Sequence, residues 1–291
     1  MIDQGQMIAR LGGIEFGGLG DLIIQEFDPG DTEITVNDAN IPMGDGVMVG
    51  RDFLGGKTWG FTLATNRADV EGARRTAAQL GTMWRSPSIR RTPGAVVPLS
   101  YRVGSQWRRV YGRPGRWADP IPDVRAMQGV MVVACDFRVT DPRHFAEDQS
   151  VVTLTVVPES TGGLRFPARA PFRFNSRGGA RVGLVDNQGD AATPLIVTFH
   201  GPCRDPKVVA AAGWEIGLVG SLAYDVSVTV DALAKTVTRS DGAEVPGMLT
   251  RATVLSRAEL PVGQSDITFT CVDETATAKA VLSYRHAFTT L

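Results

Sequence analysis

The sequence has little of what a metalloprotein, a thiol enzyme or a membrane protein needs. Its 291 residues include three cysteines and three histidines, and neither two histidines nor two cysteines lie at the short spacing of a metal site. No apolar run approaches the roughly 20 residues of a membrane span, and the first residues lack the pattern of a secretory signal. These absences predict reduced thiols, no membrane span and synthesis in a cytoplasm.

The sequence also lacks an excess of charge of either sign. It contains 30 basic and 31 acidic side chains, which give a net charge of -1. A protein that binds nucleic acid mainly through phosphates needs a basic surplus. We therefore expect no direct readout of nucleic acid.

What the sequence does contain is the composition of a folded, mainly β protein. Apolar residues make up 43% of the chain, and 33 glycines and 17 prolines accompany only 7% aromatic residues. Such usage favours many short strands that are joined by tight turns. Because 291 residues exceed the usual single domain, we expect two domains, residues 1–148 and 149–291.

The first domain is expected to hold short strands and one helix. Residues 22–27 and 59–63 read as strands, and glycine-rich turns adjoin both. A helix is predicted over about residues 68–85, because Ala73, Ala77, Leu80 and Trp84 recur every three or four positions. Pro87 is expected to end it.

Three further segments complete the reading of the first domain. Residues 95–110 predict two extended pieces around Gly104 and Ser105, and residues 113–116 are expected to break that pattern. Residues 127–139 then predict a strand on which Cys135 points to the buried side. Residues 141–144 close the domain.

The second domain shows the clearest alternation of apolar and polar residues. Segments 221–231, 267–271 and 278–285 each predict a strand with one buried face, and only residues 207–212 hint at a helix. Turn signals recur between the strands, which favours a sandwich or jelly roll over a parallel sheet with helices.

The motifs that could carry chemistry fail on inspection. Residues 50–58 end in Gly-Lys-Thr like a phosphate-binding loop, but the glycine that the motif needs at position 51 is Arg51, and a strand follows instead of a helix. His144, His200 and His286 lie far apart in the sequence. Acidic turns at residues 28–31 and 186–190 could hold calcium, but such residues are also the default of tight turns.

The cysteines give no stronger indication of catalysis. Cys135 and Cys271 lie on alternating strands and are expected to pack in the core, and Cys203 is expected to be a loop thiol. The sequence has no nucleophile elbow and no obvious acid and base pair. We therefore predict no catalytic, cofactor-binding or metal-binding residues, and a protein that is not an enzyme.

The densest basic and aromatic stretch lies at residues 107–117. In a nearly neutral protein such a stretch favours a protein interface over a nucleic-acid groove. Its members are Trp107, Arg108, Arg109, Tyr111, Arg113, Arg116 and Trp117.

The order of these elements resembles the distal tail proteins (Dit), also known as minor tail proteins, of long-tailed siphovirus bacteriophages. Residues 137–143 are similar to that family's strand that ends in Phe-x-x-x-Asp-Pro, and residues 187–196 to its Asn-x-Gly turn before a Pro-x-Ile strand. Residues 226–237 resemble its strand, aspartate and hairpin. Residues 260–267 resemble its Leu-x-Pro-Gly-x-Asn-x-Ile turn, with one residue inserted and Asp266 in place of Asn.

This resemblance implies a structural role in the virion. Members of the family form a hexameric hub ring that joins the tail tube to the tip or baseplate proteins. It implies an N-terminal split-barrel-like domain that forms the ring and a C-terminal galectin-like β-sandwich. A ring needs a head-to-tail interface, to which the helix at 68–85 and the stretch at 107–117 are candidate contributors.

The main alternative is a carbohydrate-binding, lectin-like module that contacts a host surface glycan. Such a module needs exposed aromatic side chains on which a sugar can stack. In the second domain only Trp214, Tyr224 and Tyr284 are available, and the two tyrosines are expected to face the core.

Overall fold

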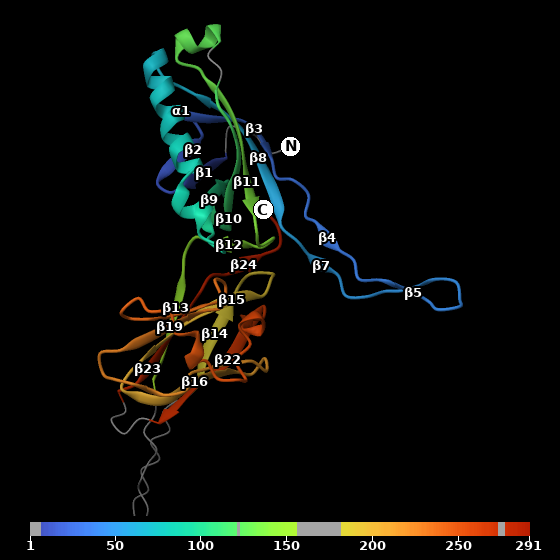
Figure 1. The fold of residues 1–291 in the computed structure, drawn as a ribbon, viewed down its shortest axis with the longest axis vertical. Coiled ribbons are helices and arrows are strands. Elements are labelled where there is room, and N and C mark those ends of the chain that lie inside the picture. Colours follow the sequence, from blue (N-terminus) through green and yellow to red (C-terminus); the bar gives the residue numbers. More distant parts are fainter. Residues whose placement is uncertain (1–6, 121–122, 156–181, 273–276) are drawn as a thin grey trace, which may run out of the picture. The chain divides into compact units, whose positions relative to one another are not determined.

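The structure is a computed structural model that describes residues 7–120, 123–155, 182–272 and 277–291. Contacts divide the chain into two compact units. Unit 1 comprises Met1–Glu147 together with Phe288–Leu291, and unit 2 comprises Asp148–Ala287 (Figure 1). The last four residues, which the sequence analysis assigned to the second domain, therefore belong to unit 1.

Contacts of the Arg108 guanidinium explain why the chain end belongs to unit 1. This group lies 4.1 Å from the ring centre of Phe288 and donates a hydrogen bond of 2.6 Å to the carbonyl oxygen of Thr290. A cation over an aromatic ring and a charge-assisted hydrogen bond act together here.

Unit 1 is built on one antiparallel sheet. In its described part the strand order is β2-β1-β9-β10-β11-β8-β3, with β12 beside β10 and β24 beside β12. Helix α1 runs along this sheet (Figure 1). The strands are β1 (Ile8–Leu11), β2 (Ile14–Gly17), β3 (Leu22–Asp28), β8 (Lys57–Thr65), β9 (Val97–Val103), β10 (Gln106–Ala118), β11 (Val132–Val139), β12 (His144–Ala146) and β24 (Ala287–Phe288).

The core of unit 1 is rich in aromatic side chains. Alternate residues of β8, namely Trp59, Phe61 and Leu63, are buried because successive side chains of a strand point to opposite faces. The ring of Trp59 lies 5.1 Å from that of Tyr101, and the ring of Phe61 lies 5.5 Å from that of Phe16, both edge to face. Each such ring contributes roughly 2–3 kcal/mol by burial.

Helix α1 spans Val70–Trp84, inside the predicted range of 68–85. Its first turn is capped by the Asp69 carboxylate, which accepts a hydrogen bond of 2.6 Å from the amide of Gly72. The four residues that recur in the sequence are all buried. Pro87 begins a second helix, α2 (Pro87–Arg91), because proline suits the first turn of a helix.

Two other expectations for unit 1 need correction. Strand β10 does not break at residues 113–116 but continues to Ala118 through a β-bulge between Pro114 and Trp117. A bulge tolerates proline because the ladder of hydrogen bonds is interrupted there. The segment at 127–139 is strand only from Val132, because a 3₁₀ helix, η2 (Val124–Gln128), precedes it.

An arm, here defined as residues 29–56, connects β3 to β8. It contains β4 (Ile34–Thr35) paired with β7 (Phe53–Leu54), and β5 (Ala39–Asn40) paired with β6 (Val47–Met48). Figure 1 shows it as a narrow two-stranded extension that leaves unit 1 where β3 ends and β8 begins.

Unit 2 consists of two antiparallel sheets in its described part. One has the order β13-β23-β15-β19-β20 with β21 beside β15, and the other the order β14-β22-β16-β17 with β18 beside β16. The strands are β13 (Ser150–Thr155), β14 (Val182–Asn187), β15 (Thr193–His200), β16 (Cys203–Ala210), β17 (Glu215–Gly217), β18 (Ser221–Leu222), β19 (Ser227–Asp231), β20 (Thr236–Arg239), β21 (Glu259–Leu260), β22 (Gly263–Val272) and β23 (Lys279–Tyr284). Two short 3₁₀ helices, η3 (Pro246–Met248) and η4 (Leu255–Arg257), lie between β20 and β21.

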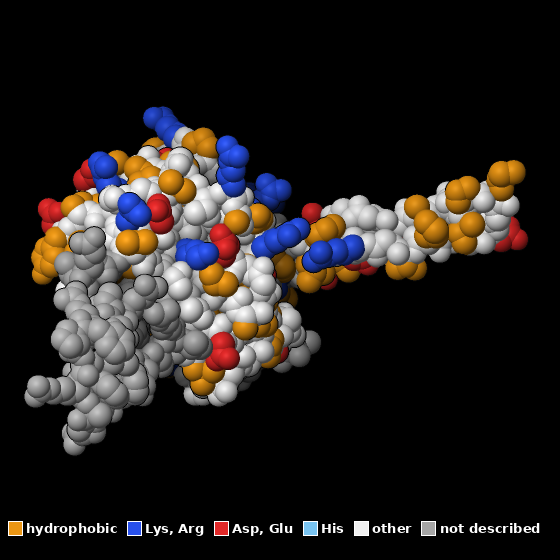
Figure 2. Space-filling view, turned by 90° about the horizontal axis from the view of Figure 1, so that it is seen from below, with side chains coloured by type: hydrophobic (Ala, Val, Ile, Leu, Met, Phe, Trp, Pro, Cys, Tyr) orange, Lys and Arg blue, Asp and Glu red, His pale blue; other side chains and the backbone are white. Residues whose placement is uncertain are grey.

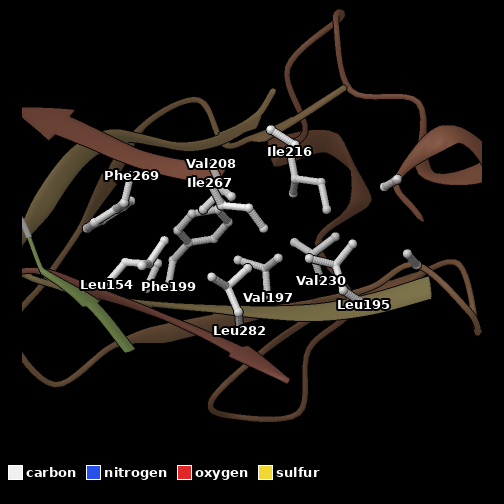
Figure 3. Packing of buried hydrophobic residues seen from close by; sticks show 14 of the residues in the cluster. Leu154, Leu195, Val197, Phe199, Val208, Ile216, Val230, Ile267, Phe269 and Leu282 are labelled. Atoms are coloured by element: carbon white, nitrogen blue, oxygen red, sulfur yellow. The ribbon is translucent and has the colours of Figure 1, made fainter. Parts of the chain in front are cut away.

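The two sheets of unit 2 enclose a mostly aliphatic core (Figure 3). Val197 and Phe199 of β15 and Leu282 of β23 point from one sheet toward Ile267 and Phe269 of β22 on the other (Figure 3). Alternation along β15, where every second residue is buried, produces this arrangement. The mainly β fold class predicted from the sequence is confirmed.

Local expectations for unit 2 were less accurate. Residues 207–212 lie largely in strand β16 and are not helical, because β16 pairs with β22 and β17. Cys203 is not a loop thiol but a buried residue at the start of β16. Tyr224 does not face the core, because the chain turns between β18 and β19 and leaves that ring exposed.

Candidate interaction surfaces

The structure places the Gly-Lys-Thr motif at the root of the arm. Residues 50–56 lie in the arm, and Lys57 and Thr58 begin strand β8 instead of a helix. The Nζ atom of Lys57 lies 3.1 Å from Nε2 of His144, not in a cradle of backbone amides. A phosphate loop needs such amides at a helix N-terminus, so the segment has a structural role.

Lys57 belongs to a polar cluster inside unit 1. His144 is completely buried, its Nδ1 lies 2.7 Å from the hydroxyl oxygen of Tyr101, and its ring stacks on Trp59. Burial lowers the pKa of Lys57 and raises the pKa of Tyr101. The positive charge of Arg108 lowers the pKa of Tyr101, but by less than burial raises it. The partners satisfy one another, which is what buried polar groups require.

The thiols are packing groups. Cys135 is buried, and burial, together with the neighbouring charge of Asp136, raises its pKa to about 12. A thiol with that pKa is almost entirely protonated at neutral pH and is a poor nucleophile. The sequence-based expectation that Cys135 packs in the core is confirmed.

Each of the two acidic turns is stabilised by a hydrogen bond within the turn. The Asp28 carboxylate accepts a hydrogen bond of 2.9 Å from the Gly30 amide, and buried Asn187 accepts one of 3.2 Å from the Gly189 amide. These are the local bonds by which Asp and Asn stabilise turns. Across the described residues, His, Cys, Asp and Glu side chains form no group of three that could hold a metal ion.

Internal contacts occupy most of the basic and aromatic stretch at residues 107–117. Arg109 forms a two-pronged ion pair with Glu147, and Arg113 donates a hydrogen bond of 2.9 Å to the carbonyl oxygen of Ile89. The Trp117 indole donates to the Asp119 carboxylate at 3.0 Å. The stretch therefore mainly connects elements of unit 1 to one another.

Among the described residues of unit 2, the three aromatic side chains considered for sugar stacking do not form a platform. Trp214, the ring that the sequence left available for stacking, is 7% exposed and donates a hydrogen bond of 2.8 Å to the carbonyl oxygen of Glu259. Tyr284 is also buried, and its hydroxyl donates to the carbonyl oxygen of Asp186 at 2.9 Å. Only Tyr224 of these three is exposed.

The arm is the surface that the sequence analysis missed. Figure 2 shows hydrophobic side chains along the arm and at its end. Soluble proteins rarely expose such contiguous apolar surface unless it binds something. Its nine exposed large apolar residues are Ile34, Val36, Ile41, Met43, Val47, Met48, Val49, Phe53 and Leu54.

A second surface lies on the body of unit 1, beside α1. An apolar groove of about 770 Å³, here called the α1 groove, is formed by α1, α2, β9 and the β1-β2 turn. Met83 of α1, Ile89 of α2 and Val97 of β9 line it, together with Leu11 and Ile14. The β1-β2 turn lies close to α1, where a Cβ atom at Gly12 would be 2.3 Å from the mobile methyl group of the Met83 side chain.

The sequence carried a partial signal for the arm. Residues 34–54 hold apolar residues in pairs and triplets between aspartates and glycines, in runs too short for core strands. Exposure depends on whether another segment covers these residues, and the local pattern does not contain that information. The α1 groove combines distant segments and left no signal that could have identified it.

Comparison with known proteins identifies the fold. The fold is similar to that of a phage baseplate protein: a chain of the phage P2 baseplate in its activated conformation with Ca superposes with a TM-score of 0.57 at 10% identity, over 95% of this chain and 97% of that one. A second P2 baseplate structure, with Sr, gives a TM-score of 0.58 at 11% identity, over 96% and 97%.

The particular fold is that of the Dit protein of phage SPP1. Its crystal structure matches with a TM-score of 0.59 at 13% identity, over 97% of this chain and 99% of that one. No family model and no curated protein matches the sequence significantly. The likeness therefore lies in the fold and not in the residues. Among the described helices, none has both the length and the apolar character that a membrane crossing requires.

Proposed function

We propose that this chain is a structural component of a phage tail tip or baseplate, a hub that joins the tail tube to the tip proteins. The observation that carries the proposal is the match of almost the whole chain to SPP1 Dit, which is described as a paradigm of the hub adsorption apparatus in phages that infect Gram-positive bacteria. The match covers 97% of this chain and therefore includes residues of both units, so the proposal concerns the whole chain.

The distribution of side chains supports assembly over catalysis. The cysteines, the histidine of the core and the acidic turns all serve packing or turn geometry, while the arm exposes apolar surface. Proteins that assemble commonly expose apolar surface, which becomes buried in the contact. The chain is therefore proposed to have no enzymatic activity of its own.

The finer assignment follows the predicted domains. Residues 1–148, most of unit 1, form the ring, and residues 149–291, which contain unit 2 except for Asp148, form an outer galectin-like sandwich. The ring is a homohexamer in the virion tail, made in the cytoplasm of the host. Its partners are the tail-tube protein on one side and tail-tip proteins on the other. A host surface glycan remains the alternative ligand of the outer domain.

Mass measurement in solution, combined with negative-stain imaging of the purified chain, tests this proposal. We expect a particle of about six subunits with a ring-shaped view, since closed cyclic symmetry needs head-to-tail contacts. A strict monomer at all concentrations would overturn the hub, and its retention on a glycan array would favour the lectin alternative.

A further inference from the structure

The arm exposes apolar side chains up to its end. Met43 is fully exposed at the arm's end and adopts a left-handed backbone with φ of 59°, a conformation that is costly for a residue other than glycine. The turn around it is held by a hydrogen bond of 3.2 Å from the Ile41 amide to the Gly46 carbonyl oxygen. Methionine adapts its shape to a partner surface, which suits such a position.

The arm is also acidic. Residues 29–56 contain five acidic side chains and one basic side chain, Arg51, which gives a net charge of -4. The acidic residues are Asp31, Glu33, Asp38, Asp45 and Asp52. A partner surface for the arm should therefore combine an apolar floor with basic surroundings.

The α1 groove has these two properties. Its floor is apolar, and the segment 84–97 that borders it carries three arginines and no acidic residue. Arg85 is paired with Asp119 at 2.6 Å, whereas Arg90 and Arg91 end the short helix α2 without an acidic neighbour in that helix. The groove and the arm are therefore complementary in both polarity and charge.

The arm of a given copy does not reach its own α1 groove. Within unit 1, Figure 1 shows the arm leaving from β3 and β8 and extending away from α1. Two different, complementary surfaces on one chain that cannot meet each other are what a head-to-tail contact between copies requires. Such contacts close into a ring when the rotation between copies is right.

We propose that the arm of one copy packs in the α1 groove of the next copy. This inference rests on the proposed function, because it takes the ring as given and names the two surfaces that join its subunits. The apolar residues near the arm's end cover the groove floor formed by Met83, Ile89 and Val97. The acidic residues of the arm lie near Arg90 and Arg91.

A cross-linking experiment on the full-length chain tests the contact directly. Copies that carry Met43→Cys are mixed with copies that carry Ile89→Cys and are treated with a short bismaleimide. We expect a covalent dimer in the mixture, because each contact brings position 43 of one copy to position 89 of another. Copies with Val124→Cys, an exposed position outside the groove, replace the Ile89→Cys copies as the control for random collision and native thiols.

A substitution experiment measures how much the contact contributes. The double variant Val47→Asp, Val49→Asp changes two exposed side chains, so its melting temperature should stay within 2–3 °C of the unchanged chain, as roughly expected for surface sites. We expect its subunit dissociation constant to rise at least about tenfold. Val124→Asp, the matched exposed control, should leave the dissociation constant unchanged.

The outcomes separate this inference from the proposed function. The inference is wrong, while the hub function stands, if the unchanged chain forms a ring but two results follow. The double variant forms the ring with unchanged affinity, and no cross-link to position 89 appears. If the unchanged chain forms no ring, the proposed function itself fails. A ring that the arm variant weakens, together with the specific cross-link, supports both.

Discussion

Units 1 and 2 are both antiparallel β structures, yet they differ in where they leave apolar side chains. Of the 22 large apolar residues that are exposed in the described part of the chain, nine lie on the arm of unit 1, six elsewhere in unit 1 and seven are spread over unit 2. Scattered single residues need no explanation, whereas a cluster does. The comparison shows that the clustered apolar surface lies on unit 1, the part of the chain that is proposed to form the ring.

The two cores differ as well. Unit 1 buries Trp59, Phe61 and Tyr101 around a histidine, while unit 2 is filled mainly by valine, leucine and isoleucine between two sheets. Four of the five tryptophans of the chain lie in unit 1. Tryptophan fluorescence therefore reports mainly on unit 1, and far-ultraviolet circular dichroism reports on both units.

The largest effect should come from removing a ring from the core of unit 2. Phe199→Ala should lower the free energy of unfolding of unit 2 by about 3–5 kcal/mol, because it leaves a cavity between the sheets. In urea, the dichroism signal should show an early transition while tryptophan fluorescence changes late. Equal shifts of both signals would mean that the units unfold as one, and Phe61→Ala should give the reverse pattern.

A smaller loss of stability should follow from the substitution of a glycine in unit 1. Gly129 has a φ of 79°, and a Cβ atom there would lie 1.8 Å from the carbonyl oxygen of Arg67. Gly129→Ala should cost about 2–3 kcal/mol, from backbone strain and displacement of that carbonyl.

Gly94 provides the matched control for this prediction. Its φ is 73°, but no atom lies within 4 Å of a Cβ there. Gly94→Ala should cost only about 1 kcal/mol from strain alone. Equal costs for the two variants, measured by the fluorescence transition in urea, would contradict the role of the close approach.

The cap of α1 should matter less again. Asp69→Ala removes the acceptor for the Gly72 amide and should destabilise unit 1 by about 1 kcal/mol. Ser86, the cap position of α2, makes no side-chain cap bond, so Ser86→Ala should change stability by only a few tenths of a kcal/mol. Thermal unfolding followed by fluorescence compares the two, and a larger loss for Ser86→Ala would refute the assignment.

The smallest effect concerns pH and unit 2. Burial, and to a lesser degree the charge of Lys279, lower the pKa of His200 below its ordinary value of 6.5. The unfolded chain thus binds the proton more readily, so unit 2 should lose stability as the pH falls from about 6.5 toward the lowered pKa. The loss should be a few tenths of a kcal/mol, because the side chain is only partly buried.

Lys279→Gln tests the electrostatic part of this dependence. His200 and Lys279 are cross-strand partners in β15 and β23, so the substitution removes a like charge directly opposite the imidazole. The loss of stability between pH 7 and pH 5, measured by dichroism in urea, should become smaller. A steeper loss in Lys279→Gln would show that Lys279 does not disfavour the protonated imidazole.

The sequence allowed several of the longer regular elements to be predicted, for reasons visible in single residues. Alternation at Val133, Cys135 and Phe137 indicated β11, and the spacing of Ala73, Ala77 and Leu80 indicated α1. The wrong predictions concern segments whose structure depends on contacts with other segments. Residues 207–212 hint at a helix until the pairing of β16 with β22 is known, and Tyr224 fits an alternating pattern that the turn before β19 interrupts.

The candidate surfaces were less predictable than the fold. The composition of the stretch at 107–117 predicted a protein interface, but Arg109 and Arg113 form hydrogen bonds with residues inside unit 1. The arm and the α1 groove depend on which segments remain uncovered. That property belongs to the assembled unit and not to any local run of residues.

By itself, the sequence determined the mainly β class, the one long helix and the scarcity of reactive groups, because composition and periodicity act locally. Only the tertiary structure decided that the arm leaves its apolar residues exposed, that α1, α2 and β9 enclose a groove, and that residues 288–291 belong to unit 1. Burial is a relation between segments distant in the chain, so only the folded molecule fixes which apolar side chains form the core and which remain for a partner.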